Sequence, residues 1–263
     1  MLPQCILVFD IETVPDIASG KKLWDLGDLD DRDALKAMQA KRLQKTKLSD
    51  FMPLHLHKIV AISAVLRTQG AVKLWSIGEE DSSEAELVER FLRGLERFEP
   101  TIISWNGAGF DLPVIHYRSL LHGISAPHYW EIGQEVQSFR WSNYLNRYHW
   151  RHIDLMDVLS GFQPRAWTSL QDITVMLGLP GKMGMDGSRV WDAFNSGQIK
   201  KIRDYCEVDV LNTYLVYLRF ELMRGHLSGT DLEDECKTLR EMLADKQEKH
   251  LQEFLERWSE ITN

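Results

Sequence analysis

The chain has 263 residues, of which 44% are hydrophobic and 27% are charged, a composition typical of soluble globular proteins. The net charge is −8, and the segment from Asp231 onward contributes much of it with 10 acidic and 5 basic side chains, so the charge does not exclude a nucleic-acid partner. The apolar runs are too short to cross a bilayer, no cationic signal peptide is visible, and the three cysteines lack zinc-finger spacing, so secretion and membrane insertion are excluded and a cytoplasmic location is expected.

The hydrophobic pattern predicts five strands with helices between them. Apolar runs bounded by turn signals indicate buried strands, and Thr68-Gln69-Gly70 predicts a hairpin between the second and the third. A polar, helix-prone stretch at about 16–50 is expected to be an insertion, and six of its residues between Arg32 and Lys47 are basic. The strands are expected at Gln4–Phe9, Lys58–Arg67, Ala71–Ile77, Thr101–Ser104 and Ile153–Leu155.

Helices are expected on both sides of the fourth strand and throughout the last third of the chain. Apolar residues at helical spacing predict a helix at Ser83–Phe98, capped by Ser82 or Ser83. Other helices are predicted near Asp111–His122, from Gln198 to about Met223, and from about Leu232 to Ile261. A three-strand meander followed by alternating helices and strands indicates a mixed α/β sheet. We expect residues 1–230 to form this domain, and 231–263 to form a C-terminal amphipathic helix packed on it.

Three acidic residues follow predicted strands. Asp10 and Glu12 are two residues apart, so on an extended strand both leave the same face, roughly 7 Å apart at the backbone. A shared hard cation could hold this pair, and an ordinary polar strand end is the alternative. Asp111 follows the fourth strand after Gly107 and Gly109, which permit a tight turn and close approach of a ligand. Asp111 could equally cap its helix.

A fourth acidic residue, Asp209, lies on the long late helix. It is four residues after Tyr205, so both side chains share one helical face, while Glu207 points elsewhere and is excluded from the site. Taken alone, this spacing also fits a solvated helix face.

In this order and context, the four acids and the tyrosine resemble the DEDDy group of 3′–5′ exonucleases of the RNase H-like superfamily, and in particular predicted exonucleases related to the proofreading domain of family-B DNA polymerases. The resemblance implies an RNase H-like sheet of five strands, a three-strand antiparallel meander plus parallel strands, flanked by helices. The matching motifs are Phe9-Asp10-Ile11-Glu12-Thr13, Asn106 to Asp111 and Tyr205 to Asp209, with further similarity at Phe51–Leu66, His152–Ser160 and Leu179–Gly187.

The resemblance also implies an activity, a cofactor and a role for each residue. The expected reaction is removal of nucleotides from the 3′ end of single-stranded DNA, with release of nucleoside 5′-monophosphates, and DNA is expected over RNA because of the similarity to proofreading domains. Two divalent cations, Mg²⁺ or Mn²⁺, suit the oxygen ligands. By resemblance, Asp10 bridges both cations, Glu12 and Asp209 bind the first, Asp111 binds the second through water, and Tyr205 orients the attacking water.

Substrate contacts are expected around the same motifs. Asn106, Phe110 and the backbone near Ile11 and Thr13 are candidates for holding the terminal nucleotide, although Thr13 could be only a turn residue. Lys182 could approach a substrate phosphate or lie in solvent. Gly181-Lys182 is not a P-loop, because methionines occupy positions 176 and 183.

Several other signals leave alternatives open. The segment Phe139–Arg151 mixes aromatic residues with arginines, which fits either stacking on single-stranded nucleic acid or a core-lining segment. The basic stretch from Arg32 to Lys47 could clamp a strand or form a solvated helix face. The histidine pairs His55/His57 and His149/His152 favour packing roles over zinc ligation, and Asp154 is a candidate supporting residue. Rival functions are an exoribonuclease resembling RNase D and a catalytically silent nucleic-acid-binding module on the same fold.

Overall fold

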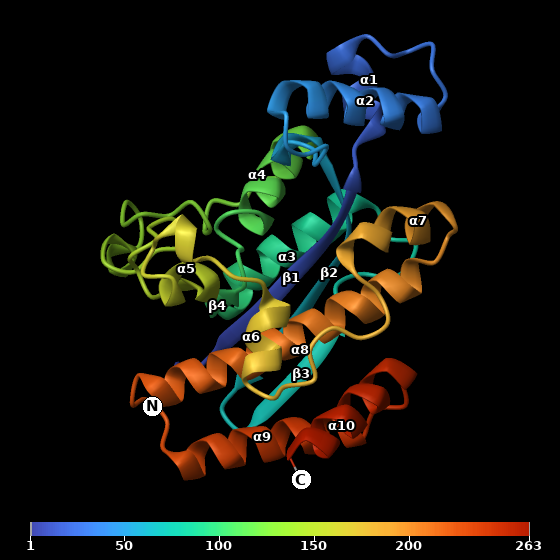
Figure 1. Ribbon diagram of the computed structural model, residues 1–263. Helices are drawn as coiled ribbons and strands as arrows, with labels where there is room; N and C mark the ends of the chain where they lie inside the picture. Colours follow the sequence, from blue (N-terminus) through green and yellow to red (C-terminus); the bar gives the residue numbers. More distant parts are fainter. Residues whose placement is uncertain (1, 263) are drawn as a thin grey trace.

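A mixed five-stranded sheet forms the centre of the molecule (Figure 1). The computed structural model describes residues 2–262, and the strand order is β3-β2-β1-β4-β5. The pairs β1–β2 and β2–β3 are antiparallel, whereas β1–β4 and β4–β5 are parallel. The predicted sheet, a meander joined to parallel strands, is therefore confirmed. The strands are β1 (Ile6–Pro15), β2 (His57–Thr68), β3 (Ala71–Ser76), β4 (Thr101–Ser104) and β5 (His152–Asp154).

The first strand is longer than its apolar run predicts. Expected to end at Phe9, β1 continues to Pro15, because its pairing with β2 extends until Pro15 lies opposite His57. The register shifts between Glu12 and Thr13. Backbone pairing rather than side-chain hydrophobicity thus keeps the polar motif inside the strand, where the alternation of faces still applies.

Helices cover both faces of the sheet (Figure 1). Ile6 and Val8 of β1 belong to the core shared with α8, whereas Leu7 and Phe9 belong to the core shared with α3 and α4. Residues 10 and 12 continue the series of Ile6 and Val8, so their side chains leave the strand on the α8 face.

The helices follow the predicted pattern closely up to α8. Ser83 caps α3, as expected, by accepting a hydrogen bond from the Glu86 amide. Within the described part of the chain, no helix is both long and apolar enough to cross a membrane. The α-helices are α1 (Ile17–Trp24), α2 (Asp31–Thr46), α3 (Glu84–Phe98), α4 (Asp111–His122), α5 (Leu155–Leu159), α6 (Leu170–Met176), α7 (Val190–Asn195), α8 (Ile199–Met223), α9 (Gly229–Ala244) and α10 (Lys249–Thr262), and short 3-10 helices occur at Leu54–Leu56, Gln137–Arg140, Pro164–Ala166 and Gly187–Arg189.

The predicted insertion consists of α1 and α2, which project at one end of the molecule (Figure 1). A buried ion network anchors its base. Asp16 caps α1 and accepts a hydrogen bond from Arg118 of α4 at 2.5 Å. The same guanidinium donates to Glu84 of α3 at 2.5 and 2.7 Å. Because these three side chains are buried and satisfy one another, the network fixes the direction in which the chain leaves β1.

The C-terminal segment forms two helices, and the prediction of one helix from Leu232 to Ile261 is wrong in this respect. The chain turns between α9 and α10, and the Gln252 side-chain amide donates to the Leu243 carbonyl there at 3.1 Å. Both helices contact α8, and Leu243 and Phe254 are fully buried in the same core. The turn allows both amphipathic helices to place their apolar faces on this core.

Candidate active site

The two carboxylates of β1 lie beside α8. Asp10 is half-buried and Glu12 is 7% exposed. A carboxylate oxygen of each, together with the sulfur of Cys206 on α8, forms a group of atoms that all lie within 4.8 Å of one another. The structure therefore brings together the two acids that the strand periodicity places on one face.

Helix α8 adds Tyr205 and Asp209 to this group. Both side chains lie on one helical face, as their spacing of four residues predicts, and both are buried rather than solvated. The Oδ1 atom of Asp209 is buried and has no hydrogen-bond partner among the described residues. A buried carboxylate oxygen without a donor costs free energy, and a bound cation would offset that cost.

Asp111 reaches the site from the other side of β1. It is the first residue of α4, and its Oδ1 accepts a hydrogen bond of 3.1 Å from the Ile11 amide, between the two acids of β1. The alternative role as helix cap does not apply, because Phe110 occupies the cap position. The Ile11 amide thus donates to Asp111.

The four carboxylates interact electrostatically. Burial, followed by the charges of neighbouring acids, raises the pKa of Asp10 and of Glu12 well above the usual range. Burial raises the pKa of Asp111 to about 7 and that of Asp209 to about 6. Such a cluster of hard oxygen donors is destabilised by its own negative charge, and it matches the ligand preference of Mg²⁺ and Mn²⁺.

Tyr205 and Lys182 lie at the edge of this cluster. Burial, and then the charges of Asp209 and Glu12, raise the pKa of Tyr205 far above its usual range, so the phenol remains protonated and can donate a hydrogen bond. The Lys182 ammonium lies 5.6 Å from the Tyr205 ring centroid. Its positive charge acts to lower the pKa of both Glu12 and Asp209. This position fits the predicted approach of Lys182 to a phosphate.

The loop before Asp111 is held by Asp154, at the end of β5. The two carboxylate oxygens of Asp154 each accept a backbone hydrogen bond of 2.9 Å, one from Asn106 and one from Ala108. Asn106 has φ of +66°, and a Cβ on Gly109 would lie 2.4 Å from its Oδ1. The supporting role suggested for Asp154 is therefore found, and glycine at 109 leaves room for the Asn106 side chain, which a Cβ there would displace.

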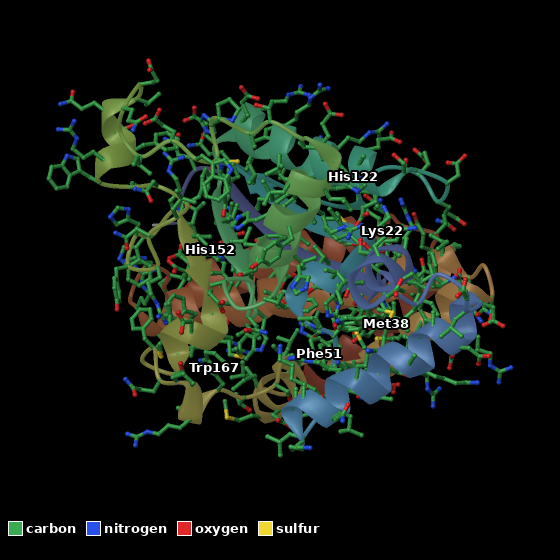
Figure 2. All side chains as sticks on the ribbon, turned by 90° about the horizontal axis from the view of Figure 1, so that it is seen from above. Lys22, Met38, Phe51, His122, His152 and Trp167 are labelled. Carbon is green, nitrogen blue, oxygen red and sulfur yellow. The ribbon has the colours of Figure 1, made fainter. Side chains whose placement is uncertain are left out.

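A pocket of about 650 Å³ opens beside Glu12. Its walls include Thr13 of β1 and the aromatic rings of Phe51, Phe110 and Trp191, and Asn106 also lines it. In the view of Figure 2, Phe51 lies between Met38 of α2 and Trp167 on the other side. The volume falls within the ~300–1,000 Å³ range of small-molecule sites. Other surface pockets of about 610 and 630 Å³ do not contain any of the four acids.

His57 supports one wall of this pocket. Its Nε2 lies 3.1 Å from the Met52 carbonyl, which can only accept, so Nε2 is the donor and Nδ1 is left as an acceptor for the Thr13 hydroxyl at 2.9 Å. Burial lowers the pKa of His57, which favours this neutral form. The ring also contacts Phe51 and Phe110 at centroid distances of 4.8 and 5.1 Å. The packing role expected for this histidine is thus observed, and Thr13 is a pocket residue.

Cys206 is the site residue that sequence reasoning missed. Its sulfur lies 3.4 Å from the Asp10 carbonyl oxygen and 3.6 Å from Asp10 Oδ2. A residue next to Tyr205 is turned by about 100° around the helix, so the spacing that connects Tyr205 with Asp209 gives no signal for it. Only the packing of α8 across β1 brings the thiol to the carboxylate.

Other candidate residues lie away from the four acids. Glu207 accepts hydrogen bonds from Ser76 at 2.7 Å and from His250 at 2.8 Å, which agrees with its exclusion. The segment Phe139–Arg151 is divided: Phe139 and Tyr144 are buried in the core, whereas Trp141 and Tyr148 are exposed on the surface.

The comparison with known proteins agrees with this geometry. A search of curated proteins found no match. The family model of predicted 3′–5′ exonucleases related to the exonuclease domain of PolB matches residues 49–258, about four fifths of the chain. This range contains Asp111, Tyr205 and Asp209, while Asp10 and Glu12 precede it on the strand that completes the same site. The chain therefore belongs to the family of predicted 3′–5′ exonucleases related to the exonuclease domain of PolB.

Proposed function

We propose that the protein is a metal-dependent 3′–5′ exonuclease that removes nucleotides from a single-stranded DNA end and releases nucleoside 5′-monophosphates. The observation that supports this most is the convergence of three buried acids, the half-buried Asp10 and one tyrosine, from β1, α4 and α8, beside a pocket large enough for a nucleotide. DNA rather than RNA is proposed because the family is related to the exonuclease domain of a DNA polymerase.

The residues present fit a pair of divalent cations. The unpartnered Asp209 Oδ1 and the raised pKa values of the cluster both indicate carboxylates that need positive charge. We assign Asp10 to both cations, Glu12 and Asp209 to the first, and Asp111 to the second through water. When bound, the two cations supply the charge that activates a water and stabilises the attacking and leaving oxygens of the phosphodiester.

The protein's own groups position the substrate and the water. Tyr205 remains protonated, so its role is to donate a hydrogen bond that orients the attacking water rather than to remove a proton. Lys182 places a positive charge near Glu12 and Asp209, where it can contact the scissile phosphate. Both groups act at the edge of the carboxylate cluster.

The pocket beside Glu12 is assigned to the terminal nucleotide. Phe110 and Phe51 offer ring faces for the base, and stacking on aromatic side chains stabilises single-stranded nucleic acid by about 1–3 kcal/mol per base. Asn106 and Thr13 provide polar groups at the same wall. Because the Ile11 amide is engaged by Asp111, we assign Ile11 to holding that ligand rather than the nucleotide.

Degradation of a 5′-labelled oligonucleotide by purified protein tests this proposal. We expect a ladder shortened from the 3′ end with Mg²⁺ or Mn²⁺, its loss on chelation, and its loss in Asp10→Ala. An equal ladder from wild type and Asp10→Ala would contradict the assignment. Single-stranded, recessed and blunt ends in parallel define the strand preference.

The two rival functions have their own readouts. Matched deoxyribo- and ribo-oligonucleotides distinguish a DNA exonuclease from an exoribonuclease resembling RNase D. A catalytically silent binding module would retard the oligonucleotide in a gel without shortening it. The presence of all four acids in one cluster argues against the silent module.

A further inference from the structure

The only cysteine of α8 lies at the carboxylate cluster. Cys206 is fully buried and follows Tyr205 directly on α8. Its sulfur contacts Asp10 of strand β1. Its sulfur and one oxygen each from Asp10 and Glu12 lie mutually within 4.8 Å. The three ligand atoms therefore come from two elements that the core of the protein holds together.

The spacing of these atoms suits a soft metal ion. Ligand bonds of about 2.0 Å from oxygen and about 2.3 Å from sulfur, at a tetrahedral angle, place the two ligand atoms about 3.5 Å apart. The observed distance from Cys206 Sγ to Asp10 Oδ2 is 3.6 Å. Even without an ion, the sulfur and the oxygen are thus separated by about the distance found between two ligands of a tetrahedral zinc ion.

A further observation indicates that this cluster accepts a cation. Asp209 is 8% exposed, its Oδ1 has no partner among the described residues, and its charge acts on Asp10, Glu12 and Cys206. A buried carboxylate oxygen without a partner, on a residue whose charge acts on all three ligand residues, is a negative charge that a cation bound there would neutralise. The arrangement is more than an isolated thiol.

We propose that Cys206, Asp10 and Glu12 form a binding site for a thiophilic divalent cation such as Zn²⁺ or Cd²⁺. Binding forms a metal–sulfur bond, breaks the S–H bond and releases the thiol proton to solvent, without oxidation or reduction. The cation would occupy the carboxylates needed for Mg²⁺ and thus inhibit the enzyme. This inhibition rests on the proposed nuclease function, whereas the binding does not.

Cation selectivity follows from the ligand types. Mg²⁺ prefers oxygen and near-octahedral geometry, so the thiol adds nothing to its binding. Zn²⁺ binds thiolate and carboxylate together and generally exceeds Mn²⁺ in affinity for the same ligands. The thiol at 206 therefore makes the site sensitive to soft cations in a way that four acids alone would not.

The test uses Cd²⁺ and the ultraviolet absorption of its thiolate complex, which requires no turnover. In the Cys5→Ser/Cys236→Ser protein, Cys206 is the one remaining thiol of the sequence. We expect a saturable cadmium–thiolate band from this protein, and an affinity weaker by at least about tenfold when Asp10→Asn or Glu12→Gln is added. Absence of the band, or an affinity that neither substitution changes, would overturn the proposal.

Cys206→Ser provides the matched variant. Serine retains a donor for the Asp10 carbonyl but has little affinity for soft cations, so the band should be absent while Cys5 and Cys236 remain. We also measure the Zn²⁺ concentration that halves each protein's own Mg²⁺-supported rate. This concentration should be at least about tenfold higher for Cys206→Ser than for the control variant Cys5→Ser. Cadmium binding without nuclease activity would contradict the proposed function alone, whereas activity without cadmium binding would contradict this inference alone.

Discussion

At the scale of single residues, the four acids of the site are not fully neutralised by basic side chains of the described residues, so their ionised forms are unfavourable without a cation. Burial has the largest effect on the pKa values of Asp10 and Glu12, and the charges of Asp111 and Asp209 raise both further. Cations would relieve this repulsion. Without them, each ionised carboxylate lowers the stability of the folded protein.

Asp209→Asn tests this balance between function and stability. We expect activity to fall about 10²-fold or more, because the variant lacks a charged ligand of the proposed cations. In chelator at neutral pH, the variant should be more stable by about 1–3 kcal/mol, because the pKa of Asp209 is raised to about 6 and its ionised form is unfavourable. Thermal melting in chelator and the oligonucleotide assay measure the two effects.

Glu207→Gln is the matched control on the same helix. Burial acts to raise the pKa of Glu207, but hydrogen bonds from His250 and Ser76 outweigh this effect and lower it. The charged form of Glu207 therefore stabilises the fold. This variant should lose stability and retain the nuclease reaction. If Glu207→Gln were more stable than wild type, or Asp209→Asn less stable, the electrostatic interpretation would be contradicted.

Tyr205→Phe should slow the reaction without abolishing it. The raised pKa keeps the phenol protonated, so its proposed role is only to orient water, and its removal is expected to reduce the rate by about 10–10²-fold, with little change in substrate affinity. Single-turnover rates for wild type and variant provide the comparison. An unchanged rate would remove the tyrosine from the mechanism.

At the scale of elements, the position of α1 and α2 depends on a few buried groups. Arg118 joins the N-terminus of α1 to α3 and α4 through Asp16 and Glu84. Gln39 of α2 and Phe51 line the pocket, so this network also positions one wall of the candidate site. The sequence predicted a helical insertion here, but not the residue that anchors it, because the partners are 34 and 102 positions away in the chain.

Arg118→Ala should therefore be strongly destabilising. Removal of one member of a buried ion network leaves uncompensated charges, so we expect the free energy of unfolding to fall by about 3–5 kcal/mol. Lys36→Ala breaks an exposed pair with Asp33 on α2 and should cost less than about 1 kcal/mol. Urea unfolding of both variants gives the comparison, and similar losses for the two would show that the network does not anchor the insertion.

At the scale of the whole molecule, stability without metal should depend on pH in a characteristic direction. The pKa values of Asp111 and Asp209 are raised from 3.8 to about 7 and about 6. Between these values and 3.8 the folded state binds more protons than the unfolded state. The stability contributed by these protonated groups is therefore full below about pH 3.8 and is lost as pH rises through about 6 to 7.

Bound Mg²⁺ should reverse this contribution, because the ligands bind the cation in their deprotonated form. Melting temperatures across the same pH window, with chelator and with saturating Mg²⁺, measure the effect. The Asp111→Asn/Asp209→Asn protein should show a flatter pH dependence in chelator. Equal slopes for this protein and wild type would contradict the assignment of the titrating groups.

The sequence by itself determined the sheet, most helices and the five residues of the predicted catalytic set. These features depend on local periodicity: alternation along β1 joins Asp10 to Glu12, and a spacing of four joins Tyr205 to Asp209. Their assignment as one set came from the resemblance in motif order, and the structure brings them together.

Only the tertiary structure decided the remaining features of the site. The contact of Cys206 with Asp10, the commitment of the Ile11 amide to Asp111, and the turn between α9 and α10 involve partners from different elements. Local sequence patterns specify the direction in which a side chain leaves its own helix or strand. The group it meets is set by how those elements pack, because that packing depends on the complementary surfaces of the whole chain.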